Sequence, residues 1–201
     1  MITKRLVIAL IAGYVSLTLA GEPTQPAQPP PPPFKKRALA LGYAGSIVGV
    51  DVPRNGDDRL NIEGLGVLGR IDLHEGHRGW GLQVGYASKD GGTGSDGEMS
   101  LDQAGAYAYY AWEDYAMEDF RVRIYPKVGV SRTGFEEKVP LTGTFSEAAF
   151  GPSFGLGVEW GGPRWGLVFD ASWTFVDVEL IPGQKESFNV SAGFIGLGYC
   201  F

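Results

Sequence analysis

The chain has 201 residues, enough for one domain, and its 31 glycines and 12% aromatic residues favour an all-β architecture of short strands and turns. Its formal net charge of −6 disfavours a nucleic-acid partner, which requires a basic face on the protein. The single cysteine, Cys200, excludes an internal disulfide bond and a metal cluster held by cysteines.

The first 20 residues have the layout of a secretory signal peptide. Lys4 and Arg5 form a charged start, residues 6–19 form an apolar run, and Ala20 supplies the small residue that a signal peptidase requires. We therefore expect cleavage after Ala20. The alternative is an N-terminal membrane anchor, for which the apolar run is short.

Residues 21–37 form a proline-rich segment that we interpret as a periplasmic linker. The run of prolines at 29–33 excludes helix and sheet pairing and favours an extended polyproline II conformation. Lys35, Lys36 and Arg37 end the segment. They leave two interpretations open, a solvated spacer and a segment that docks in the periplasm.

From residue 38 onwards, apolar residues alternate with small or polar ones, which is the period of a β-strand. The alternation is ambiguous only in the fourth segment, where tyrosines fall on both faces. Pro126 and Pro152 lie inside predicted strands and remove ladder donors, so we expect a local bulge or gap at each. The predicted strands are residues 38–50, 60–73, 80–87, 99–112, 120–132, 145–160, 165–180 and 187–201.

The connections alternate between tight turns, such as 75–78 and 161–164, and longer polar loops, of which 133–144 is the longest. This alternation is typical of bacterial barrels, which have short periplasmic turns and long outer loops.

Four tryptophans fall at the turn end of their predicted strands, where indole rings would lie at a membrane interface. We expect them to form an aromatic girdle. They are Trp80, Trp112, Trp160 and Trp165.

The last strand stops on Phe201, with Tyr199 and Leu197 on the same face and small residues between them. This strand resembles the C-terminal signal strand of bacterial outer-membrane proteins. In those proteins the strand is recognised by the assembly machinery, so the resemblance implies that role for Phe201, Tyr199 and Leu197.

Residues 38–201 as a whole resemble the small eight-stranded bacterial outer-membrane barrels of the OmpA/OmpX type. The resemblance implies an all-β fold, an eight-stranded antiparallel transmembrane β-barrel, located in the bacterial outer membrane. It also implies contact with outer-membrane lipid, with lipopolysaccharide and with the assembly machinery.

Charged residues collect on the predicted inward faces, and the lumen of an eight-stranded barrel is only wide enough for side chains. Charges there must pair, because an isolated buried charge is costly. We expect a plug of ion pairs. The acids expected near Arg121 and Arg123 are Glu159, one strand away, and Asp72, across the barrel, with Glu159 as the favoured partner, and Asp170 is expected beside Lys127. The predicted network is Arg70, Asp72, Arg121, Arg123, Lys127, Glu159 and Asp170.

The function that this pattern favours is structural, or surface interaction and adhesion through the outer loops. One alternative is a small pore for ions or solutes, and another is a lipid A-modifying barrel enzyme. Hydrolysis requires a nucleophile beside a base, and the only histidines, His74 and His77, lie in a predicted turn far from a matching serine. We therefore expect no catalytic residue, no metal and no cofactor.

Overall fold

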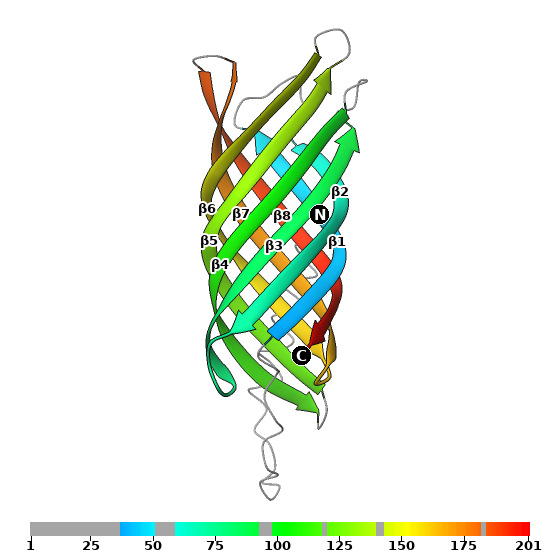
Figure 1. Cartoon of the computed structure of the whole chain (residues 1–201), viewed down its shortest axis with the longest axis vertical. Helices are drawn as coiled ribbons and strands as arrows, with labels where there is room; N and C mark the ends of the chain where they lie inside the picture. The colour runs from blue at the N-terminus through cyan, green and yellow to red at the C-terminus, as the bar shows by residue number, and fades with distance from the viewer. Residues whose placement is uncertain (1–36, 51–58, 93–97, 118–119, 140–142, 182–183) are drawn as a thin grey trace, which may run out of the picture. The chain divides into compact units, whose positions relative to one another are not determined.

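The computed structural model describes residues 37–50, 59–92, 98–117, 120–139, 143–181 and 184–201. Within these ranges the chain forms eight strands that close into one antiparallel barrel, each strand pairing with its sequence neighbours (Figure 1). The strands are β1 Arg37–Val50, β2 Arg59–Asp72, β3 Arg78–Gly92, β4 Glu98–Met117, β5 Phe120–Val139, β6 Gly143–Gly161, β7 Trp165–Ile181 and β8 Gln184–Cys200. The predicted fold, an all-β eight-stranded antiparallel transmembrane barrel, is confirmed.

The ends of the described chain close the barrel. β8 pairs with β1 from Ala38↔Cys200 to Val50↔Phe188, and the red end of β8 lies beside the blue start of β1 in Figure 1. The backbone N–H of Phe201 donates to the carbonyl of Arg37 at 3.0 Å. We call this end, where β1 begins and β8 finishes, the turn end, and the opposite end, where β1 finishes, the loop end.

The lipid-facing side of the barrel is a belt of exposed apolar side chains on all eight strands. Leu65 is 75% exposed, Val128 62% and Phe150 74%. In β6 and β7 the belt runs from residue 150 to 160 and from 165 to 175, which is the length a tilted strand needs to cross the hydrocarbon core. Exposing so much apolar surface to water would be unfavourable, whereas contact between these side chains and lipid tails is favourable.

The alternation inverts between this belt and the loop end. There the outward side chains are polar, as at Asp177 and Asn189, while the inward side chains of Val178 and Val190 are fully buried. Apolar residues turn inward where water replaces lipid outside, because the favourable place for an apolar side chain is then the lumen. The inversion marks where the barrel leaves the hydrocarbon.

This inversion explains why several predicted strand ends were wrong. At the loop end, the third strand continues past Ala87 to Gly92 and the fifth past Arg132 to Val139. At the turn end, where this inversion does not apply, the fourth strand continues past Trp112 to Met117. The predicted long loop 133–144 is therefore mostly strand. The sequence analysis assigned these polar segments to loops. Outside the hydrocarbon, however, polar side chains are the usual outward-facing residues of a strand.

The two prolines produce gaps in the ladders. Beside Pro126 the β4–β5 pairing passes from Tyr109↔Lys127 to Trp112↔Ile124 without a change of register. Beside Pro152 the β6–β7 pairing ends at Ser153↔Thr174. A missing donor is tolerated at these positions, as expected.

Residues 1–36 lie outside the described ranges, so the signal peptide and almost all of the linker 21–37 stay predictions. No helix in the described part of the chain is long and apolar enough to cross a membrane.

Candidate functional site in the barrel lumen

The turn end of the lumen is organised around Asp72 of β2. Arg123 of β5 reaches across the lumen and donates to it through both terminal nitrogens, Nη1 at 2.8 Å from Oδ2 and Nη2 to Oδ1. The hydroxyl of Tyr109 on β4 also donates to Oδ1. A buried carboxylate with a bidentate guanidinium and a phenol donor has its charge and its lone pairs satisfied.

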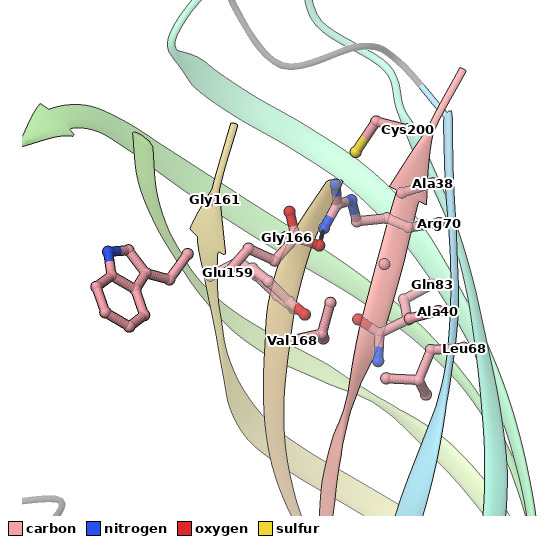
Figure 2. Close-up of a pocket in the computed structure, with 13 residues that line it drawn as sticks. Ala38, Ala40, Leu68, Arg70, Gln83, Glu159, Gly161, Gly166, Val168 and Cys200 are labelled. Atoms are coloured by element: carbon pink, nitrogen blue, oxygen red, sulfur yellow. Dashed lines mark ion pairs between the residues drawn. The ribbon is translucent and has the colours of Figure 1, made fainter. Parts of the chain in front are cut away.

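A second ion pair joins Arg70 of β2 to Glu159 of β6 through Nη1 and Oε1, as the dashed line in Figure 2 shows. Nε of Arg70 also lies 3.7 Å from Oδ1 of Asp72, which links the two pairs. A cavity of about 20 Å³ lies beside Arg70, lined by Glu159, Tyr125 and Cys200 among others. That is room for about one water, placed to accept a hydrogen bond from Nε or Nη2 of Arg70, neither of which has a hydrogen-bond partner among the described residues.

Tyrosine rings fill the space around the arginines. The Arg70 guanidinium lies 5.5 Å from the ring centroid of Tyr125 and 5.9 Å from that of Tyr109. Each ring covers a glycine on the neighbouring strand, because a Cβ at Gly81 would come within 2.2 Å of Tyr109 and one at Gly157 within 2.0 Å of Tyr125. The tyrosines thus supply apolar packing and cation–π contact where the charges are desolvated.

Further along the lumen, Lys127 of β5 pairs with Oδ1 of Asp170 on β7, and Gln83 of β3 donates to Oδ2 at 3.1 Å. The Lys127 ammonium lies 4.2 Å from the ring centroid of Tyr107. All three polar side chains are more than nine-tenths buried. The middle of the lumen is therefore occupied by a salt bridge that is itself enclosed.

Beyond this pair, a chain of hydrogen bonds crosses the lumen. Lys89 of β3 donates to Ser46 and, at 3.1 Å, to Gln103. Gln103 donates to Thr174 at 3.3 Å, and Thr174 donates to Ser153 at 3.0 Å. Side chains from five of the eight strands, β1, β3, β4, β6 and β7, take part in this chain.

The loop end of the lumen is closed by an apolar cluster. Its members are buried inward side chains from β2, β4, β5, β7 and β8, and two of its rings, Phe135 and Phe188, lie 5.5 Å apart. A dry apolar constriction resists the entry of water and ions. The cluster is Ile62, Leu101, Phe135, Val176, Val178, Phe188 and Val190.

All seven residues of the predicted charge network face the lumen and are at most 8% exposed. Asp170 lies beside Lys127, as expected. The expected pairing of Glu159 with Arg123 is wrong, although the two residues are directly opposite in the β5–β6 register. The Arg123 guanidinium extends across the lumen to Asp72, the other acid expected near it, and Glu159 is engaged by Arg70.

Sequence reasoning missed the tyrosines, Lys89, Glu113 and the apolar cluster. A signal for the tyrosines was present, since Tyr109 and Tyr125 each stand opposite a glycine once the strands are paired. A signal for the cluster was the alternation of Val176, Asp177 and Val178, which reverses the pattern found earlier in the same strand.

The residues predicted for the surface lie outside the lumen. Trp80, Trp112, Trp160 and Trp165 are between 43% and 61% exposed. The rings of Trp165 and Tyr199 lie 4.7 Å apart and bridge β7 and β8. The three predicted assembly residues also face outward: Phe201 is 55% exposed, Tyr199 37% and Leu197 60%.

The two histidines lie in the turn between β2 and β3. Nδ1 of His74 is 3.0 Å from the carbonyl of Trp80, and Nδ1 of His77 is 3.6 Å from a carboxylate oxygen of Glu113. Both contacts fasten the turn to neighbouring strands.

The sequence matches no known protein-family profile and no curated protein. Among solved structures, it is similar to the attachment invasion locus protein Ail of Yersinia pestis, with 20% identity, a TM-score of 0.55 and coverage of 84% of this chain and 99% of Ail. Ail has also been solved in complex with the heparin analogue sucrose octasulfate.

Two further solved structures share the fold. Neisserial surface protein A is 9% identical, with a TM-score of 0.56 and coverage of 82% of this chain and 97% of that one. The outer membrane protein AlkL is 17% identical, with a TM-score of 0.51 and coverage of 90% and 97%. The chain has the fold of the small eight-stranded outer-membrane barrels.

Proposed function

We propose that this protein is an integral outer-membrane barrel with a closed lumen, which acts through its outer surface rather than as a pore or an enzyme. The observation that carries this proposal is the filling of the lumen at successive heights. Ion pairs fill the turn end, a salt bridge and a hydrogen-bond chain fill the middle, and the apolar cluster fills the loop end. Among the described residues, a cavity between these layers has a volume of about 50 Å³, far too small for a continuous water path.

The same proposal includes the route to the membrane. Secretion through the predicted signal peptide, assembly through Phe201 and its outward neighbours, and contact with outer-membrane lipid and lipopolysaccharide fit the exposed apolar belt. The fold shared with outer-membrane proteins supports this location.

Conductance in planar lipid bilayers tests whether the lumen is closed. We expect the refolded wild-type barrel to show no discrete current steps. A matched variant, Val178→Asp, places a charge in the apolar cluster and should admit water at the loop end. Stable single-channel steps from the wild type would contradict the proposal and favour the small pore.

The charge of the outer surface indicates which surface ligand the barrel takes. Between the apolar belt and the loop end, the exposed charged side chains of the described residues include four carboxylates and one cation, Arg132. The connections 51–58, 93–97, 140–142 and 182–183 add four aspartates and one arginine to the sequence at this end. The exposed carboxylates are Glu63, Asp90, Asp102 and Asp177.

We infer that the ligand is a neutral or cationic surface, because an acidic end repels polyanions. This differs from Ail, which was solved with a sulfated sugar. Binding of cells that display the barrel to heparin-coated and to polylysine-coated surfaces separates the two ligand types. Preferential binding to heparin would contradict the inference.

A further inference from the structure

The charge of the described lumen is unevenly distributed. At the turn end three cations, Arg70, Arg121 and Arg123, face three carboxylates, Asp72, Glu113 and Glu159. This layer is neutral.

Nearer the loop end, the buried positive charges outnumber the buried negative charges of the described residues. Lys127 and Lys89 are 3% and 1% exposed, and the buried carboxylate of this layer is Asp170 alone, within the described residues. Asp170 is already engaged by Lys127 and by Gln83. One buried positive charge, that of Lys89, is therefore left without a carboxylate partner in the described part of the chain.

The contacts of Lys89 are neutral. Its ammonium donates to the hydroxyl of Ser46 and to the amide oxygen of Gln103. An ammonium carries three donors, so one donor stays available. Lys89 is paired across the β3–β4 ladder with Leu101 of the apolar cluster, which lies between the ammonium and the loop end. An unpaired ammonium in such a place is costly.

A cavity lies at this position. Its volume is about 50 Å³, and Lys89, Lys127 and Gln103 line it together with Tyr107 and Ser172. A bound water occupies roughly 10–15 Å³ of such a cavity, so this cavity has room for a monatomic ion and a water or two. The lining therefore offers two ammonium groups and several neutral groups that can donate a hydrogen bond. Asp170, which pairs with Lys127, also lines the cavity, so these three charged groups sum to one net positive charge.

We propose that this lumen cavity holds a small monovalent anion, of the size of chloride, bound by the Lys89 ammonium. The anion neutralises the surplus charge and accepts the remaining donor of Lys89, while hydroxyl and amide groups complete its shell. This site is independent of the surface role proposed above.

Diffraction from crystals of the refolded wild-type barrel grown in bromide tests the site directly. We expect an anomalous peak in the cavity within hydrogen-bond distance of Lys89 Nζ, and no such peak in Lys89→Met. A cavity that contains only water in the wild type, or a peak that persists in Lys89→Met, would overturn the proposal.

Unfolding by urea in lipid vesicles gives an independent measurement. The folding equilibrium constant of the wild type should rise about tenfold for each tenfold increase in chloride above the dissociation constant, at ionic strength held constant with gluconate. Arg132→Met, which removes an exposed cation from β5, should respond as the wild type does. Lys89→Met should fold without a response to chloride, and a wild type equally stable in chloride and gluconate would contradict the site.

Discussion

The pairing of Asp72 with Arg123 makes a quantitative prediction about stability. Both side chains are buried, with Asp72 6% and Arg123 1% exposed, and the guanidinium satisfies both carboxylate oxygens. Removing one partner of such a pair leaves an uncompensated charge, which typically costs about 3–5 kcal/mol. We therefore expect Asp72→Asn and Arg123→Gln each to lower the free energy of unfolding by about that amount.

The double variant separates the pair from its surroundings. Because neither charge is left alone, Asp72→Asn with Arg123→Gln should recover part of the loss, with a coupling energy of about 2 kcal/mol or more. The assay is equilibrium urea unfolding in lipid vesicles, followed by tryptophan fluorescence and by heat-modifiable mobility on gels.

A control cycle uses Glu159, which stands directly opposite Arg123 in the β5–β6 register but is bound by Arg70. Its coupling with Arg123 should be smaller than that of Asp72. Additive single effects for Asp72 and Arg123, or a stronger coupling between Glu159 and Arg123, would refute the assignment of pairs across the lumen.

Three further outcomes are expected. Val128→Arg places a charge in lipid and should cost ~2–4 kcal/mol in vesicles, whereas Ser172→Arg faces the lumen near Asp170 and should cost less; equal costs would contradict the facing. Val178→Asp puts a charge in the apolar cluster and should lower stability by about 2 kcal/mol or more, while Asp177→Asn on the outer face should change it by less than about 0.5 kcal/mol. Deleting Phe201 should reduce outer-membrane levels and leave unfolded protein in the periplasm, and normal levels would argue against an assembly role.

The sequence by itself determined the strand number, the direction of most side chains within the belt and seven of the nine buried charges of the described residues. The reason is local. In a strand that crosses lipid, the facing of every residue follows from the period of two, so Val128 and Lys127 could be assigned to opposite faces without any partner. Strand ends were less accessible, because a polar residue such as Asp177 looks the same in a loop and in a strand that projects into water.

The Lys127–Asp170 pair was expected from the sequence, but the tertiary structure decided which acid each lumen arginine binds. Partner choice depends on the width of the lumen, on the tilt of the strands and on the reach of each side chain, and none of these is a local property. Arg123 thus bypasses Glu159, its neighbour in register, and binds Asp72 on the far wall. Likewise, only the closed lumen shows that the Lys89 ammonium donates to Ser46 and Gln103, and that Lys89 lines a cavity together with the Lys127–Asp170 pair.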